Sequence, residues 1–494
     1  MPDDTAPTNP PSHALPTGTP TPPRGEGPTA AAPSRRFGSP VGAVIAWVIV
    51  IVVAVAWIRF MQGEATDMAG APVSAVGIQD ELIGRLAISA EKLERDTGME
   101  MGSKAILLQA EPLRTGSPAQ RVAYAILLGA VGGPDRGRAE LTAAETAEPV
   151  VPWSAADLAM RDEVHRRFET QLAGEIVAPL GEAESHRLGF FGELLDGSAL
   201  RSSRAIVTLF VAVGWYAVVG IAGFVLLVTL VALGAVGYLR ARCSPASPLG
   251  FVLIETFALW LCLFCGMQSV AVVVSESLGD STLRLLIAPV MFFGSLVVLV
   301  WPRLRGVPWS VTRNAIGWRT DGVVGDVGWG ALGYSISLPL LGAGLALALF
   351  LSWLVGVPPN ATHPAIERIS KSGPLGLANL FFLACVAAPI VEETMFRGVL
   401  YRHLRDVTGP NEGSGFGRGV LTALSVAVSA VISSAIFASI HPQGLVFAPV
   451  LAGLACGFCL VREWRGSIVP GAVAHGVANF VTLSLNVGLQ SWLG

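Results

Sequence analysis

Long apolar runs recur along this chain of 494 residues, and they constrain its fold more than any other feature. In hydrocarbon, every backbone polar group has to be bonded within its own segment or barrel, so runs of about 20 apolar residues fold as helices. The composition agrees, because only 14% of the residues are charged. We therefore expect an all-α, polytopic helical membrane protein whose surroundings are the lipid bilayer. We place its nine spans near residues 41–58, 212–238, 250–274, 285–301, 330–356, 377–400, 420–441, 444–461 and 468–489.

Polar stretches divide these runs into domains. The stretch 60–203 carries charged residues at helical spacing, with helix starts at Ser117-Pro118 and at Ser154, so we expect an inserted all-helical soluble domain. Its function is not evident from the sequence, and a protein partner is one expectation. The expected order is a disordered tail at 1–38, a transmembrane anchor at 41–58, the helical domain at 60–203, further transmembrane helices at 205–301, an interfacial segment at 303–325 and a membrane core at 330–494.

Arginines alternate between the loops and predict the orientation. They gather in the tail, near 240, from 303 to 319, near 402 and near 462, whereas the opposite short loops carry few. By the positive-inside rule, the N-terminus is then cytoplasmic and the 60–203 domain extracytoplasmic, in a multi-pass protein of the cell (inner) membrane. No basic face stands out, which argues against a nucleic-acid partner. All six cysteines lie in or beside apolar segments, so we expect them to be packing residues.

Charged residues interrupt the apolar run 376–400. A charge at the bilayer centre costs about 2.5–3.5 kcal/mol on insertion scales, so Glu392, Glu393 and Arg397 need a reason to be there. Glu393 and Arg397 are four residues apart and can pair on one helix face. Glu392 points about 100° away and needs a partner on another segment, a water-filled cavity or a proton. Pro389 removes a backbone donor just upstream. A purely structural ion pair with one neutral carboxylate is the alternative.

Two further apolar segments carry polar side chains. Phe437 and His441 are four residues apart at the end of one run, and His475 and Asn479 are four apart in the last run, so each pair shares a helix face. Intramembrane ionisable groups seek each other or water, which groups these segments with Glu392. Counting about 1.5 Å per residue, however, puts His475 roughly 12 Å into its helix and His441 at the far end of its own, so spacing alone does not bring them together.

In this order the three segments resemble the motifs of the CAAX protease and bacteriocin-processing (CPBP, or Abi) family, which includes the type II CAAX prenyl endopeptidases. The matching residues are Glu392-Glu393-x-x-x-Arg397, Phe437-x-x-x-His441 and His475-x-x-x-Asn479, within about 374–489. The resemblance implies an intramembrane endopeptidase acting on a peptide or protein substrate. Residues 1–300 lie outside it.

The family pattern also implies roles. Glu392 with His441 holds and deprotonates water, His475 and Asn479 stabilise the oxyanion, and Glu393 with Arg397, together with Phe437, supports the site. A zinc ion held by Glu392, His441 and His475 is the alternative chemistry, and the family was long called metalloproteases on that ground. Because Asn479 is a poor zinc ligand, we expect that no cofactor is required.

Two other functions remain as alternatives. A membrane scaffold, or an immunity or partner-regulating protein, could use the same fold without proteolysis. A proton-coupled transporter could use the carboxylates and histidines as a relay, but it predicts paired Gly/Pro-broken repeats, and the chain shows no convincing internal repeat.

Overall fold

The structure is a computed structural model. It describes residues 37–70, 78–98, 102–146, 152–175, 180, 188, 190–195, 202–239, 241–243, 249–279, 282–319, 322–355, 373–410, 416–441 and 445–493. Over these residues the chain forms helices and no strands, as expected. Almost all of the tail expected at 1–38 lies outside the described residues.

Seven helical stretches among the described residues are long and apolar enough to cross a membrane. They are formed by α1 (Pro40–Gly70), α9 (Ser202–Ala235), α10 (Val252–Ser277), α11 with η2 and α12 (Arg284–Ser295, Leu296–Leu299 and Val300–Leu304), α14 (Val323–Val355), the stretch Pro374–Thr408, and α19 (Phe416–Ser439). The two remaining expected spans are α20 (Ala448–Arg465) and α21 (Val469–Leu493). The protein is therefore a multi-pass membrane protein, with a helix at each of the nine expected positions.

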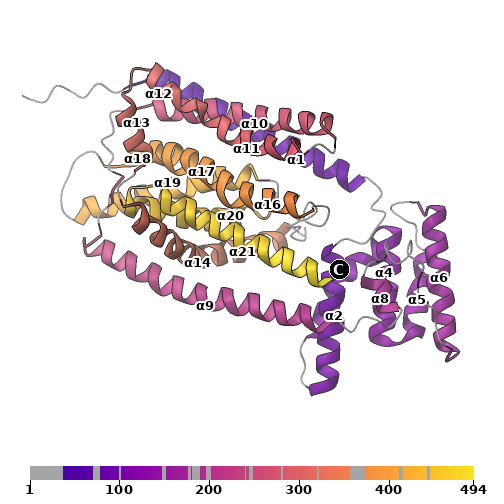
Figure 1. The fold of residues 1–494 in the computed structure, drawn as a ribbon. Coiled ribbons are helices and arrows are strands. Elements are labelled where there is room, and N and C mark those ends of the chain that lie inside the picture. The colour runs from indigo at the N-terminus through magenta and orange to yellow at the C-terminus, as the bar shows by residue number, and fades with distance from the viewer. Residues whose placement is uncertain are drawn as a thin grey trace, which may run out of the picture.

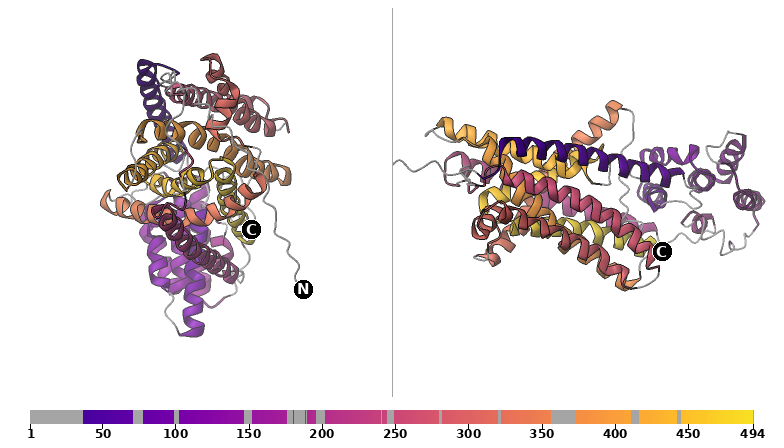
Figure 2. Two further views of the ribbon diagram at one scale, coloured as in Figure 1. Left: turned by 90° about the vertical axis from the view of Figure 1, so that its left-hand side faces the viewer. Right: turned by 90° about the horizontal axis from the view of Figure 1, so that it is seen from above.

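The helices run side by side in one bundle (Figure 1). α20 lies at its centre and packs against α14, α19 and α21, whereas α9 lies on the outside against α14. α1 and α10 pack together on the opposite side, as the two further views show (Figure 2). Large apolar side chains on the outer faces of α1 and α9, such as Val44, Val48 and Phe224, are more than half exposed, as expected for residues that face lipid.

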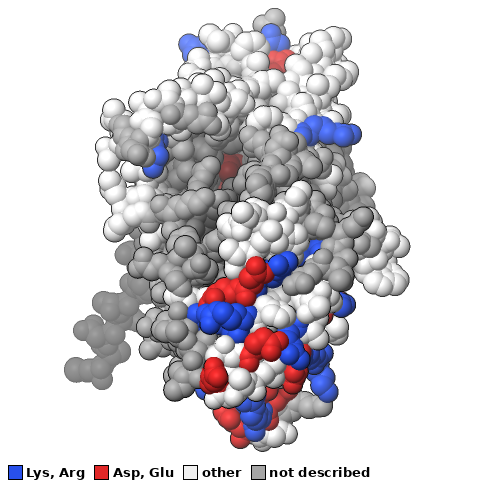
Figure 3. Space-filling model, turned by 90° about the vertical axis from the view of Figure 1, so that its right-hand side faces the viewer, with Lys and Arg blue, Asp and Glu red and all other residues white. Residues whose placement is uncertain are grey.

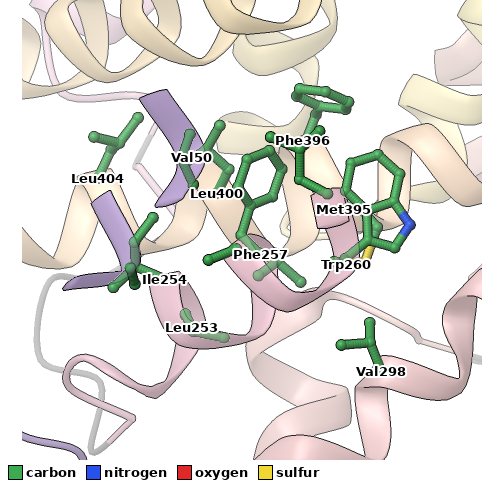
Figure 4. Close-up of a cluster of buried hydrophobic side chains, with 14 of the residues drawn as sticks. Val50, Leu253, Ile254, Phe257, Trp260, Val298, Met395, Phe396, Leu400 and Leu404 are labelled. Carbon is green, nitrogen blue, oxygen red and sulfur yellow. The ribbon is translucent and has the colours of Figure 1, made fainter. Parts of the chain in front are cut away.

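The contact between α1 and α10 explains how the anchor joins the bundle. Ala43, Ala46, Val50 and Ala54 recur every three or four residues and are all buried. Small side chains at this spacing let two helices approach closely in a membrane. The same cluster continues through α10 into the segment that carries Glu393, where Phe396 is completely buried (Figure 4). The N-terminal anchor is therefore part of the core of the membrane bundle.

Several arginines near helix ends lie at one end of the bundle. Arg405 pairs with Glu463, Arg465 with Asp326, and Arg305 with Glu255, at distances of 3.1, 2.8 and 3.0 Å. The interfacial segment contributes α13 (Trp309–Ile316), which begins directly after Pro308. α12, α13 and α18 (Tyr401–Thr408) lie at this same end (Figure 1).

The helical domain lies at the opposite end of the bundle (Figures 1 and 2). Its described helices are α2 (Ile78–Thr97), α3 (Ser103–Gln109), η1 (Glu111–Thr115), α4 (Pro118–Gly132), α5 (Pro134–Thr146), α6 (Ala155–Leu172) and α8 (Phe190–Leu195). Ser117 and Ser154 each form a complete capping box, which confirms both expected helix starts. A core that includes Phe168, Phe190 and Phe191 joins the helices, and charges of both signs are interspersed on the face that points away from the bundle (Figure 3).

Candidate active site

The stretch Pro374–Thr408 that carries the acidic motif is helical throughout but contains two π-helical segments. It passes from α16 (Pro374–Phe382) to the π-helix η3 (Leu383–Ala387), then to α17 (Ala388–Glu392), and then to a second π-helix, η4 (Glu393–Leu400). Glu392 is therefore the last residue of a short α-helical segment between two π-helices. Such insertions are rare and are found frequently at functional sites.

Pro389 explains why a backbone carbonyl in η3 bonds to a side chain of another helix. The Ala388 N–H donates to the carbonyl of Leu383, five residues back. The next residue, Pro389, has no N–H that could be given in the same way to Ala384. The Ala384 carbonyl instead accepts a hydrogen bond of 2.7 Å from Nδ2 of Asn479 on α21. Because Pro389 cannot donate to it, the Ala384 carbonyl is available to Asn479, and this hydrogen bond joins α21 (Val469–Leu493) to η3.

Glu393 and Arg397 form a buried ion pair. Arg397 Nη1 lies 2.9 Å from Glu393 Oε1, and both side chains are at most 1% exposed. Arg397 also donates from Nη2 to the Ala455 carbonyl at 3.2 Å, and its guanidinium lies 4.7 Å from the centre of the Phe437 ring. A buried charge is stable only when paired and hydrogen-bonded, so these contacts fix the position of the Glu393 carboxylate.

His475 lies between the two glutamates. Its Nδ1 is 3.2 Å from Glu393 Oε1, and its Nε2 is 3.7 Å from Glu392 Oε2. Because the carboxylate of Glu393 is paired with Arg397, it accepts from His475, so Nδ1 carries the hydrogen and Nε2 is directed to Glu392. The imidazole also stacks on Phe458 with ring centres 5.3 Å apart. His475 is 5% exposed, so its ring is held on several sides.

His441 has a defined tautomer as well. Its Nδ1 lies 2.6 Å from the carbonyl oxygen of Phe437, one turn back. A carbonyl oxygen only accepts, so Nδ1 is protonated and Nε2 has the lone pair. The Phe437 ring lies against both histidines, with centres 4.3 Å from the His441 ring and 5.8 Å from the His475 ring. Phe437 therefore contacts both His441 and His475, although the sequence places these two histidines at different depths in the membrane.

The structure brings together Glu392, Glu393, Arg397, His475 and Asn479 by direct contacts or through one shared backbone segment. His441 joins this group through Phe437. The early end of α19, at Ser439, places His441 just beyond the helix. Within the described residues, no group of three or more His, Cys, Asp or Glu side chains lies close enough together to hold a metal ion. In this structure Glu392, His441 and His475, the residues considered for zinc, are thus not grouped closely enough to form a ligand set.

Sequence reasoning missed several contributors to the site. Phe458 stacks on His475, and two glycines permit close approach: a Cβ at Gly471 would lie 2.8 Å from Glu393 Oε2, and one at Gly476 would lie 2.5 Å from the Cys385 carbonyl oxygen. Glycines beside His475 in an apolar helix are a signal of close helix packing that could have been used. Trp260 of α10, which packs edge-to-face on Phe396, had no such signal.

Comparison with known proteins extends these observations. Residues 374–481 match the family model described as type II CAAX prenyl endopeptidase Rce1-like. The fold and this segment define a helical membrane protein with a CAAX protease-type region. The match supports the assignment of this region to the CPBP family of CAAX proteases and agrees with the resemblance of the three motifs, which all lie within it. Comparisons with the curated proteins and with the solved structures found no match.

Proposed function

We propose that the protein is an intramembrane endopeptidase that hydrolyses peptide bonds in membrane-associated or lipidated peptides or proteins. The observation that carries the proposal is the position of His475 between two carboxylates, one of which is fixed by a fully buried arginine. A transport relay has no need of Asn479 beside this histidine, whereas an amide donor and an imidazole together suit a developing oxyanion. The CAAX protease-type match of residues 374–481 supports the same chemistry.

In the proposed reaction, Glu392 accepts a proton from a water molecule whose oxygen attacks the scissile carbonyl carbon. His441, with its lone pair on Nε2, accepts the second hydrogen bond of this water. Asn479 has a second amide hydrogen beyond the one given to Ala384, and it donates this hydrogen to the oxyanion. His475 keeps its Nδ1–H on Glu393 and donates to the oxyanion from Nε2 as an imidazolium, in which both ring nitrogens carry a hydrogen. Glu392 then returns the proton to the leaving amine nitrogen as the C–N bond breaks. Glu393, held by Arg397, keeps the His475 ring in its orientation.

We further propose the cell (inner) membrane as the location, with the N-terminus in the cytoplasm. The arginine-rich helix ends lie at one end of the bundle and the helical domain at the other, so the positive-inside rule assigns the domain to the extracytoplasmic side. The domain would then present its mixed charges to a protein partner or substrate outside the cell membrane.

The test is cleavage of a panel of prenylated and unmodified membrane peptides by the purified full-length protein in detergent. We expect Glu392→Gln and Asn479→Ala to lower kcat by at least about 100-fold, because general-base catalysis and an oxyanion donor each contribute about that much. Asn486→Ala is the matched control, since Asn486 is on the same helix as Asn479 but donates to the Thr482 carbonyl of that helix and not to the acidic segment.

Each arm of the assay excludes a different alternative. We expect activity to persist with a chelator, whereas loss with a chelator and recovery with zinc would favour a metal mechanism. If Glu392→Gln leaves the cellular function of the protein intact, the non-proteolytic scaffold replaces the protease.

A further inference from the structure

The end of α19 next to His441 is held by a residue from a distant part of the chain. The last carbonyls of a helix have no partner within it. The His441 N–H closes a final tight turn to the Ala438 carbonyl at 3.3 Å. The carbonyl of Ile440, directly before His441, accepts a hydrogen bond of 3.1 Å from the indole Nε1–H of Trp57.

Trp57 belongs to the N-terminal anchor α1, 383 residues away and outside the segment that matches the family. It extends the buried stripe of α1, because it follows Ala54 by three residues, as Ala46 follows Ala43, and it packs, partly buried, against the same cluster. The packing of this stripe against α10 therefore sets the rotation of α1 about its axis, and the rotation directs the Trp57 indole toward the end of α19.

This contact distinguishes Trp57 from an ordinary interfacial tryptophan. Tryptophans near membrane surfaces usually place the indole N–H among lipid headgroups. Here the N–H is committed to one backbone carbonyl at a helix end. Together with the Phe437 carbonyl, which holds Nδ1 at 2.6 Å, it fixes both the backbone and the ring of His441.

We propose that Trp57 is a positioning residue for the active site: it holds the backbone at Ile440 so that the Nε2 lone pair of His441 faces the reacting water. This inference rests on the proposed function. It makes the anchor helix a part of the catalytic assembly in addition to its role in membrane attachment.

The test compares Trp57→Phe with Trp47→Phe in the full-length protein. Trp57→Phe removes the indole N–H and keeps an aromatic ring. Trp47→Phe makes the same change on the same helix, at a ring that packs on His403. We expect Trp57→Phe to lower kcat about two- to tenfold, the value of one neutral hydrogen bond, with KM unchanged. Trp47→Phe should change neither constant.

A second readout is independent of proteolysis. Histidine selectively labelled with ¹⁵N reports the tautomer of each of the seven histidines by NMR, and a His441→Gln variant assigns the signal of His441. We expect the His441 ring signals to shift in Trp57→Phe and to stay in place in Trp47→Phe. Trp57→Met, which fills the space without a donor, repeats the measurement if Trp57→Phe does not fold.

Unchanged His441 signals in a folded Trp57 variant would overturn the inference, even if kcat falls. A further fall in kcat when Trp57→Phe is added to His441→Ala would also overturn it, because Trp57 would then act on something other than His441. If the wild-type protein cleaves no peptide but the His441 signals shift as expected, Trp57 still positions His441, and the proposed protease function is what fails.

Discussion

Gly476 offers a direct test of whether the position of α21 against η3 sets the activity. The Cβ of an alanine at this position would lie 2.5 Å from the carbonyl oxygen of Cys385, whereas ordinary contact begins at 3.4 Å. The neighbour is a backbone atom and cannot rotate away, so the two segments have to separate by about 0.9 Å. Gly476 lies directly after His475, so this separation acts on the site itself.

The consequence follows from the hydrogen bond between Asn479 and Ala384. It is 2.7 Å long, and a separation of about 0.9 Å carries it beyond hydrogen-bonding distance. A displacement of about 1 Å in a catalytic assembly costs about 100-fold in rate. We therefore expect Gly476→Ala to lower kcat by about 100-fold, measured by cleavage of the best peptide of the panel by protein in detergent.

Gly488→Ala on the same helix is the control, since a Cβ there meets nothing within 4 Å. An alanine stabilises a helix by up to about 1 kcal/mol relative to glycine, so this variant should keep the wild-type kcat with an equal or higher Tm. If Gly476→Ala retains the kcat of Gly488→Ala, the close approach of α21 to η3 does not govern the activity and the reasoning is refuted.

Two further predictions concern buried charges. Arg397→Met leaves Glu393 buried without its partner and should destabilise the protein by about 3–5 kcal/mol in denaturant unfolding; adding Glu393→Gln should recover part of this loss, and no recovery would contradict the pairing. In the helical domain, burial raises the pKa of Glu81 from 4.5 to about 7, although Arg85 opposes it. The folded domain then favours the protonated form of Glu81. The stability that this carboxyl contributes is therefore fully present below about pH 4.5 and is lost as the pH rises through about 7. Hydrogen exchange of α2, corrected for intrinsic rates, should follow this trend in the wild type and lose it in Glu81→Gln.

The local parts of the site follow from the sequence because helical periodicity sets them. Residues four apart share a face, so the pairing of Glu393 with Arg397 could be predicted from spacing, and it is seen at 2.9 Å. The same holds for the two capping boxes at Ser117 and Ser154, whose partners lie three residues away. The positions of the long apolar helices also follow, because a bilayer of fixed thickness demands helices of about 20 residues. These features depend on neighbours along one helix.

The contacts between helices could not be predicted from residue spacing, because the depth and rotation of one helix against another are set by packing over its whole length. Spacing indicates that His475 and Asn479 share a face. Only the tertiary structure shows that His475 bonds to Glu393 and that Asn479 bonds to the Ala384 carbonyl. It also places Phe437 between two histidines that the sequence put at different depths. Trp57 is the extreme case: its partner is 383 residues away, and only the packed bundle brings the two together. The sequence by itself determined the chemistry present in the membrane and its local pairing, and the tertiary structure decided which groups face one another.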